Sequence, residues 1–436
     1  MIDPRPFLVQ TFLAGVAAAD PRRATRTAVS DIADLTPSVT VIAAGKGAHL
    51  MASGAVEALQ SRDIVVGSSI VIAHDAGTQS THGQESVEGD HPVPDSRSFA
   101  AAARLHEVVS NANSSDDAIV LISGGATSLI ASPVAGLSTD QLQATFQALL
   151  SSGADINTMN AIRKRLLRFG AGRLALTLGS RRIYSLIASD VVGNDLGSIA
   201  SGPCVADSST AFEAKMRAVD AGAWESLPHA ARSLIEDMAA GRIPDSATAD
   251  HPRFASTTVQ IILDRHVASA GAAEAAKAAG LAVEVVDEAV KGEAALAGAR
   301  LVGTLPLVRP SGDQAACIIW SGETTVTMDS PGGKGGRCQE LALAAAKSLA
   351  GAGSAAGHVT LLAAGTDGRD GANDSAGAIV DSSTWLAIEQ SGRNPDHALR
   401  SHNSYDALDG VNALLKTGPT GTNVNDLIIA LVMPRG

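Results

Sequence analysis

Two short glycine-rich turns in the first half of the chain carry residue types that could bind an anion. Gly45-Lys46-Gly47 follows the apolar run Val39–Ala43, and Ser123-Gly124-Gly125 follows Ala118–Ile122. A strand that ends in glycines before a helix exposes backbone N–H groups and the positive helix end, which suits phosphate or carboxylate. Lys46 adds a point charge and Ser123 a hydroxyl. The alternative for each turn is an ordinary strand-to-helix connection, with a solvated lysine in the first.

Neither turn completes a familiar nucleotide motif. Gly45 and Gly47 begin a dinucleotide fingerprint, but Leu50 stands where its third glycine or alanine belongs, and no clear acidic residue closes a second strand about 20 residues later. The chain contains neither a G-x-x-x-x-G-K-[ST] loop nor a G-x-S-x-G elbow at these turns. A nicotinamide site is therefore weakly supported, and a Walker loop and a hydrolase elbow are not supported.

A carboxylate and a basic segment follow along the chain. Asp190 comes after the apolar run Ile183–Ala188, so we expect it at the carboxyl end of a strand, where open α/β sheets bind ligands. It could act as a base or hold Mg²⁺ together with Asp195, and a helix cap is the alternative. Asn157 precedes a basic run that includes Arg163, and most of these charges are expected on a solvated helix face.

The second half adds a cationic glycine loop. Glu323 follows an apolar run, and Gly332–Gly336 lead to Arg337, which opens a predicted helix and suits bidentate phosphate contact. Asp367 and Asn423 lie in two further turns, each of which could be a surface turn with Asx chemistry. Clusters of glycine, hydroxyl and carboxylate residues at strand ends in both halves favour a cleft between two domains.

The elements that must position these residues alternate between strand and helix. This order predicts an α/β protein with a Rossmann-like parallel sheet in the N-terminal domain. Ala240–Thr257 has little periodicity and is the best linker candidate, which gives predicted domains 1–245 and 258–436. The second set of strands begins with Thr258–Leu263. Cys317–Trp320 and Thr324–Met328 are expected to form a hairpin, so the sheet of the smaller C-terminal domain is predicted to be mixed.

Composition restricts the class of protein. A chain of 436 residues exceeds what one core usually holds, and a net charge of −12 with 3% aromatic residues argues against nucleic-acid binding. Three cysteines without C-x-x-C spacing favour a reducing compartment. Phe7–Ala19 is interpreted as an amphipathic helix and not a signal, and no apolar run reaches the roughly 18 residues of a membrane span. A cytoplasmic location is expected.

Taken in order, these segments resemble the class II glycerate 2-kinase family, whose C-terminal part is the MOFRL domain. The matching stretches run from near residue 40 to near residue 430: AAGKGAHLMA at 43, HPVPD at 91, LISGGATSLI at 121, SDVVGNDLGSIASGP at 189, SGETTV at 321, GGRCQELALAAA at 335, GTDGRDGANDSAGA at 365 and TGPTGTNVNDL at 417. Each stretch is modest, but their order is highly specific.

The resemblance implies ATP-dependent phosphorylation of the 2-hydroxyl of D-glycerate, with Mg²⁺ and an active site between the two domains. It implies active-site roles for Lys46 and Arg337, a contact loop at Ser123–Gly125 and a site aspartate at Asp190. The chain departs from the family pattern beside these loops, at Ala126, Gly170 and Cys338.

Three alternatives stay open from the sequence. One is a kinase for a longer sugar acid such as a four-carbon aldonate, the second is an NAD(P)-dependent hydroxypyruvate reductase, and the third is a ligand-binding protein without catalysis. The predicted partners are a hydroxy acid and ATP, without nucleic acid or membrane, and a homodimer is left open.

Overall fold

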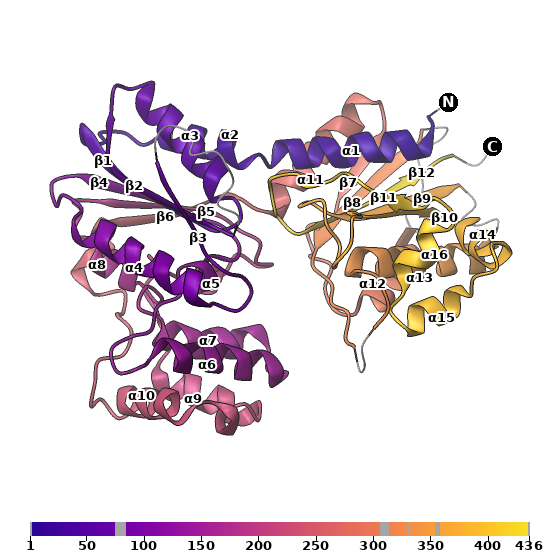
Figure 1. Ribbon diagram of the computed structural model, residues 1–436. Helices are drawn as coiled ribbons and strands as arrows, with labels where there is room; N and C mark the ends of the chain where they lie inside the picture. Colours follow the sequence, from indigo (N-terminus) through magenta and orange to yellow (C-terminus); the bar gives the residue numbers. More distant parts are fainter. Residues whose placement is uncertain (1, 75–83, 306–313, 329–331, 354–357, 435–436) are drawn as a thin grey trace. The chain divides into compact units, whose positions relative to one another are not determined.

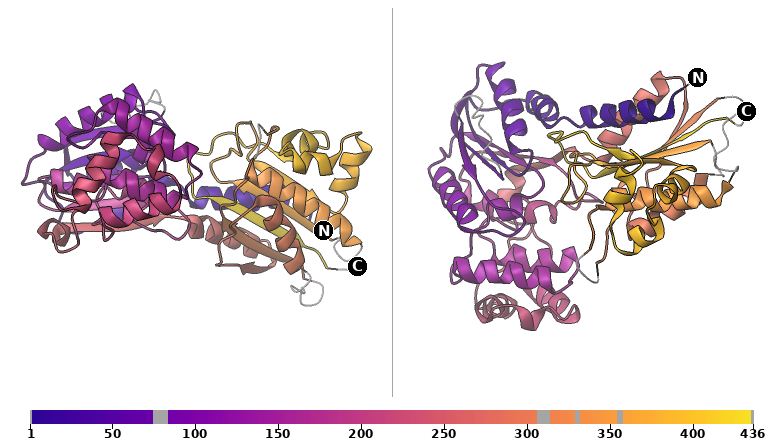
Figure 2. Two further views of the ribbon diagram at one scale, coloured as in Figure 1. Left: turned by 90° about the horizontal axis from the view of Figure 1, so that it is seen from below. Right: turned by 45° about the vertical axis from the view of Figure 1, so that its right-hand side comes forward.

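The computed structural model describes residues 2–74, 84–305, 314–328, 332–353 and 358–434 (Figure 1). The chain forms two compact units, Pro21–Ile262 and a second made of Met1–Asp20 with Leu263–Gly436. Each unit contains one six-stranded sheet with helices on both of its faces (Figures 1 and 2). The α/β class expected from the sequence is confirmed.

The first sheet has the strand order β3-β2-β1-β4-β5-β6. Its strands are β1 (Ser38–Ala44), β2 (Val65–Ala73), β3 (Glu85–Glu88), β4 (Asp117–Ile122), β5 (Ile183–Ala188) and β6 (Thr257–Leu263). The pairs β3–β2, β2–β1, β1–β4 and β4–β5 are all parallel, as predicted. Since β1 and β4 are completely buried except at Ser38, their apolar runs have no polar alternation, as is usual for strands covered on both faces.

Helices cover both faces of this sheet. On one side lie α2 (Pro21–Ser30) and α3 (Ala48–Gln60), and on the other lie α4 (Ser96–Ser110), α5 (Ala126–Leu129) and α8 (Arg173–Thr177) (Figure 1). A separate group of four helices has its own core around Phe146, Leu166 and Trp224. Its members are α6 (Thr139–Ser151), α7 (Ile156–Leu166), α9 (Ala211–Asp220) and α10 (His229–Ala239). The described residues of this unit also form short 3-10 helices at Ile199–Ser201, Trp224–Ser226 and Pro252–Ser256.

The second sheet is mixed, in the order β11-β10-β9-β12-β8-β7. Its strands are β7 (Ala282–Val285), β8 (Ala316–Gly322), β9 (Val359–Gly365), β10 (Gly377–Asp381), β11 (Leu414–Leu415) and β12 (Asp426–Val432). The strand β12 runs antiparallel to both β8 and β9, whereas β7 is parallel to β8. The mixed sheet is confirmed, but the predicted hairpin is wrong. Residues 324–328 form no strand, and Thr325 makes only an isolated bridge with Glu293.

Helices also cover both faces of the mixed sheet. One face carries α1 (Pro4–Ala18) and α11 (Arg265–Ala278), and the other carries α12 (Ala294–Thr304), α13 (Arg337–Gly351), α14 (Thr384–Gln390), α15 (Pro395–Arg400) and α16 (Ser404–Asp409) (Figure 1).

The two units differ from the predicted domains 1–245 and 258–436 in two places. The N-terminal helix α1 packs against α11, where a Cβ on Gly15 would come within 2.7 Å of the Ala268 carbonyl oxygen. This close approach of two backbones places the first residues with the C-terminal part of the chain. The second difference is β6, which the sequence assigned to the second set of strands. It completes the first sheet beside β5, so that unit extends to Ile262.

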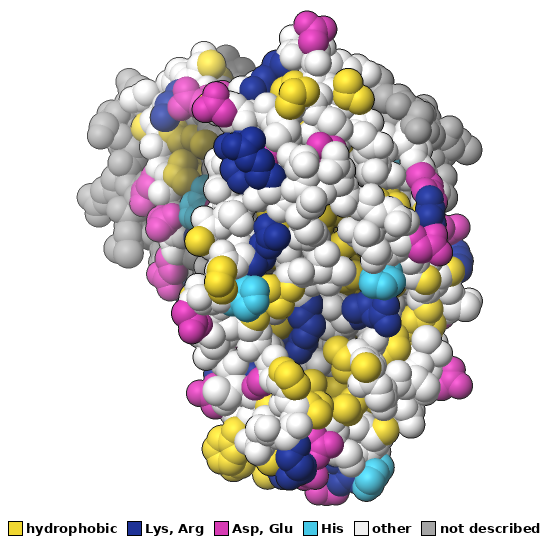
Figure 3. All heavy atoms as spheres, turned by 90° about the vertical axis from the view of Figure 1, so that its left-hand side faces the viewer, with side chains coloured by type: hydrophobic (Ala, Val, Ile, Leu, Met, Phe, Trp, Pro, Cys, Tyr) yellow, Lys and Arg dark blue, Asp and Glu magenta, His cyan; other side chains and the backbone are white. Residues whose placement is uncertain are grey.

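All three cysteines are free and buried. Within the described ranges, every helix is too short or too polar to cross a lipid bilayer. Although the net charge is −12, Lys, Arg and His side chains gather on one face of the molecule among hydrophobic and uncharged groups, with most Asp and Glu toward its rim (Figure 3).

Candidate functional site

The first candidate site lies where the strand order of the parallel sheet reverses. The strands β1 and β4 are neighbours in register, with Ala44 beside Ile122, and the chain then continues to opposite sides of the sheet. Both predicted glycine turns therefore start at the same edge. Ligands of open α/β sheets bind at such a switch point, outside the carboxyl ends of the strands.

Backbone hydrogen bonds lock the two turns together. The Lys46 N–H donates to the Gly124 carbonyl oxygen at 2.9 Å, and the Gly47 N–H donates to the Ser123 hydroxyl oxygen at 2.9 Å. Gly45 has a φ of 127°, and a Cβ there would overlap with Ser123, so only glycine fits. The Lys46 side chain is exposed, and no described residue forms an ion pair with it. The predicted residues 45, 46 and 123–125 thus form one structure.

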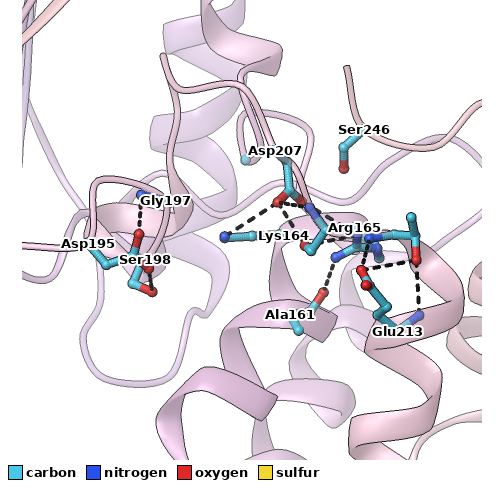
Figure 4. Close-up of polar contacts among 12 residues, drawn as sticks. Ala161, Lys164, Arg165, Asp195, Gly197, Ser198, Asp207, Glu213 and Ser246 are labelled. Carbon is cyan, nitrogen blue, oxygen red and sulfur yellow. Dashed lines mark hydrogen bonds and ion pairs between the residues drawn. The ribbon is translucent and has the colours of Figure 1, made fainter. Parts of the chain in front are cut away.

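Asp190 reaches the same edge from β5. A Cβ on Gly124 would overlap with the Asp190 carboxylate, so this carboxylate lies directly against the second glycine turn. Asp195 has a local role, since it accepts hydrogen bonds from the Gly197 N–H at 3.2 Å and from the Ser198 hydroxyl (Figure 4). Among the described residues no group of three or more His, Cys, Asp and Glu side chains could hold a metal. Magnesium binding by Asp190 and Asp195 stays a prediction.

His91 also contacts this turn, although the sequence did not favour a role for it. The Ser128 hydroxyl donates to the Pro92 carbonyl oxygen at 2.7 Å and so ties the 91–95 loop to α5. A Cβ on Gly125 would come within 2.9 Å of the His91 ring. The only sequence signal was the position of His91 in the HPVPD segment.

The charges around His91 are positive. Burial, and after it the neighbouring Lys46, His74 and Arg163, lower the pKa of His91 to about 4. The imidazole is therefore neutral at pH 7. Lys46 and Arg163 thus lie within electrostatic range of His91, which borders the glycine turn after β4, and nearby cations favour the binding of an anion.

The prediction that the basic run lies on a solvated face is wrong. Arg165 is fully buried and lies 3.5 Å from Asp207 and 3.4 Å from Asp245, while Lys164 lies 3.7 Å from Asp207 (Figure 4). Arg173 donates to the Lys164 carbonyl oxygen at 2.7 Å. The reason is tertiary, because α7 packs among α6, α9 and α10 and has little free surface.

The remaining predicted residues of α7 have different settings. Asn157 is exposed in the first turn, where its backbone N–H donates to the capping carboxylate of Asp155 at 2.8 Å. Arg163 is only 9% exposed, and its guanidinium lies 4.7 Å from the centroid of the Phe146 ring. Burial lowers the pKa of Arg163 to about 10. The structure buries Arg163, and its predicted role in ligand binding stays a prediction.

The second candidate site surrounds Arg337 at the start of α13. Its Nε and NH2 groups donate to the two carboxylate oxygens of Asp426 at 2.6 and 2.8 Å, and NH1 lies 3.1 Å from Glu323. The Asn425 amide donates to the other oxygen of Glu323 at 3.1 Å. Burial alone would lower the pKa of Arg337, but the bonds to Asp426 and its charge raise it overall. The structure thus brings the predicted Arg337 and Glu323 together and adds Asp426, which sequence reasoning missed.

A cavity of about 440 Å³ opens beside this pair. Its polar lining includes Glu323, Arg337, Glu340, Asp370 and His402, with glycines of the 333–336 loop. Volume and lining suit a small polar ligand or part of a nucleotide.

Two carboxyl groups of this cavity have raised pKa values. Burial raises the pKa of Asp370 to about 7, although it accepts hydrogen bonds from the N–H groups of Cys338 at 3.0 Å and Gln339 at 2.7 Å. Burial also raises the pKa of Glu340, whose carboxylate lies 2.9 Å from the His402 ring nitrogen. Perturbed carboxyl groups in a cavity are typical of functional sites. The sequence analysis missed Asp370, Glu340 and His402.

Asp367 and Asn423 do not line the described part of this cavity. Asp367 accepts a hydrogen bond from the Arg369 N–H at 3.0 Å, which is the Asx-turn role that was its alternative. Asn423 is half-buried, three residues before Asp426. Their predicted binding roles, and the expected cleft shared by both sets of loops, stay predictions.

Comparisons with known proteins cover nearly the whole chain. Residues 7–236 match the family model described as a domain of unknown function, DUF4147, and residues 316–426 match the MOFRL family. The chain is 34% identical over 435 residues to a glycerate 2-kinase of Pyrococcus horikoshii, covering 96% of this chain and 94% of that protein. It is 35% identical over 406 residues to a D-glycerate 2-kinase of Thermotoga maritima, covering 91% of each.

A solved structure agrees with these matches. The crystal structure of a glycerate kinase from Thermotoga maritima superposes with a TM-score of 0.85 at 32% identity, covering 98% of this chain and 99% of that chain.

Proposed function

This chain belongs to the glycerate kinase family, and from that premise we propose that it transfers a phosphoryl group from ATP to the 2-hydroxyl of D-glycerate, giving 2-phosphoglycerate and ADP. The observation that carries the proposal is the similarity, over nine-tenths or more of the chain, to two proteins named as glycerate 2-kinases. The geometry of both candidate sites is consistent with phosphoryl transfer, which depends on positioning and on neutralising negative charge.

In the parallel-sheet unit, Lys46 is proposed to bind the moving phosphoryl group. Lys46 is exposed at the switch point, in a turn whose backbone is hydrogen-bonded to the glycine turn after β4. Asp190 lies against Gly124 at the same edge of the parallel sheet. It is proposed either to accept the hydroxyl proton or to hold magnesium.

In the mixed-sheet unit, Arg337 is proposed to contact the phosphates of ATP. Asp426 fixes two nitrogens of its guanidinium, so the group is oriented before a ligand arrives. Loss of such a preorganised contact typically costs about 10²–10³ in rate.

Magnesium is compatible with the residues present. Mg²⁺ is usually held by one or two carboxylates together with substrate phosphates, so a complete protein cage is not required. Asp190 places a carboxylate against the glycine turn, and the Asp195 carboxylate accepts hydrogen bonds from Gly197 and Ser198. The ion would supply charge neutralisation between the phosphates of ATP.

The reductase alternative has less physical support. In a dinucleotide-binding fold an acidic residue at the end of the second strand binds the ribose. Here β2 ends at Ala73 and His74 follows, and Leu50 replaces the third small residue of the fingerprint. A kinase for a longer acid has no such argument against it.

The deciding experiment is a coupled ADP assay with Mg²⁺ and a panel of D-glycerate, L-glycerate and four-carbon aldonates. We expect the highest kcat/KM with D-glycerate, and NMR of the product should show phosphate on the 2-oxygen. Consumption of NADH or NADPH with hydroxypyruvate, without ADP release, would instead establish the reductase. Cytoplasmic location and a homodimer stay predictions.

A further inference from the structure

Arg163 is a buried cation without an ionic partner among the described residues. Arg163 is 9% exposed. Its Nε atom is buried and has no hydrogen-bond partner among the described residues. Its NH2 group donates a hydrogen bond to the Met159 sulfur at 4.0 Å, and a thioether sulfur is a weak acceptor.

The neighbouring cations of the same helix have carboxylate partners. Lys164 and Arg165 face the carboxylate of Asp207, and Arg165 also faces Asp245 (Figure 4). A buried charge is normally paired, because burying it without a partner is strongly unfavourable. Of these three buried or nearly buried cations, Arg163 alone has no carboxylate partner in the part of the chain that the structure describes, so a ligand is the natural source of its anion.

The guanidinium is also held in place. Its central carbon lies 4.7 Å from the centroid of the Phe146 ring on α6, within the distance of a cation–π contact. A planar guanidinium presents N–H edges for the two parallel hydrogen bonds that a carboxylate accepts. A fixed guanidinium loses little freedom when the anion binds.

A second observation points to the same ligand. Arg163 lies close enough to His91 for its charge to lower the pKa of that imidazole, after burial and together with Lys46 and His74. His91 in turn contacts Gly125 of the glycine turn after β4. Arg163 therefore lies within electrostatic range of the histidine that borders the first candidate site.

We propose that Arg163 binds the carboxylate of the hydroxy-acid substrate in a bidentate pair, which leaves Lys46 to the phosphoryl group. The inference rests on the proposed function and adds the basis of its specificity. A polyol such as glycerol has the same hydroxyl chemistry but no carboxylate. It would leave the buried guanidinium unpaired, and sites with unpaired polar groups reject such analogues strongly.

The test compares Arg163→Met and Arg163→Lys with Arg168→Met, which changes an exposed arginine just beyond the same helix. We expect Arg163→Met to raise the KM for D-glycerate roughly 100-fold, since hydrogen bonds to a charged group are lost. Arg163→Lys should raise it about 10-fold, because lysine keeps the charge but not the fork. The KM for ATP should stay within about 2-fold in all three variants, and Arg168→Met should match the wild type.

Guanidinium ion supplies a readout that separates binding from folding. Added guanidinium chloride at low millimolar concentration should partly restore D-glycerate turnover by Arg163→Ala and should not affect Arg168→Met. If Arg163→Met fails to fold, as judged by its thermal melt, Arg163→Lys and this rescue decide the matter.

Calorimetry without ATP distinguishes failure of the inference from failure of the proposed function. The wild type should bind D-glycerate and glycolate but not glycerol, and Arg163→Met should bind none of them. That pattern in a protein without glycerate kinase activity would sustain the carboxylate site and reject the proposed reaction. A wild-type KM for D-glycerate in Arg163→Met, or a rise confined to the KM for ATP, would overturn the inference.

Discussion

The carboxylate of Asp426 accepts two parallel hydrogen bonds from the guanidinium of Arg337, at 2.6 and 2.8 Å, across 89 positions of sequence. Arg337 opens α13 and Asp426 opens β12, so the pair joins the first turn of a helix to the first residue of a central strand. Asp426 is 3% exposed, whereas the Arg337 side chain is 34% exposed. The buried Asp426 therefore orients the guanidinium, and the partly exposed Arg337 can reach a ligand.

Asp426→Asn should reduce kcat by about 10- to 100-fold in the ADP assay, because a neutral amide no longer holds the guanidinium as a fork. Glu323→Gln, which changes the more exposed contact of Arg337, is the matched control and should cost less than 10-fold. A larger loss from Glu323→Gln than from Asp426→Asn would contradict the orienting role of Asp426.

Lys46→Ala should lower kcat by about 10²–10³ while the melting temperature stays near that of the wild type. The side chain is exposed and makes no ion pair with described residues, so its removal should change the free energy of unfolding by less than about 0.5 kcal/mol. Steady-state kinetics and a thermal melt measure the two effects. A melting temperature that falls together with kcat would indicate a structural lysine instead.

Gly124→Ala should inactivate the protein through a clash. The added Cβ would overlap with the Asp190 carboxylate and displace it from the glycine turn. Gly179→Ala in the same unit is the control, since a Cβ there meets nothing within 4 Å. The ADP assay should show a loss of at least about 10-fold for Gly124→Ala only. Equal activity of both variants would show that Asp190 can move without consequence.

Stability should depend on pH through Asp370. Burial raises its pKa in the folded protein from 3.8 to about 7, so the folded state binds a proton more tightly than the unfolded state. This contribution to stability is complete below about pH 4 and is lost as pH rises to about 7. Thermal melts between pH 4.5 and 8 should show Asp370→Asn gaining stability relative to the wild type as pH rises. A constant difference over that range would mean that Asp370 is ionised throughout.

Local patterns were sufficient to predict several parts of the molecule. The apolar runs before Gly45, Ser123 and Asp190 predicted parallel strands, because residues buried on both faces of a sheet leave an unbroken hydrophobic signal. The glycine turns and Asp190 were each expected at the end of a strand, and the structure brings them together at one edge of the sheet. The ordered motifs indicated the family.

Pairing across long separations could not be predicted in this way. The position of β6 in the first sheet, the packing of α1 on α11, and the bond between Arg337 and Asp426 all depend on contacts between residues far apart in sequence. The local periodicity of a sequence carries no information about such contacts.

The sequence by itself determined where strands end in glycine, hydroxyl and carboxylate residues, because those signals are local. Only the tertiary structure decided which charges are paired. On α7 two arginines with identical chemistry stand at 163 and 165, separated by Lys164. Packing buries both and brings Asp207 and Asp245 to Arg165 but no described carboxylate to Arg163. Burial makes an unpaired charge unfavourable, and burial depends on the folded structure, so it cannot be predicted from the neighbouring residues in the sequence.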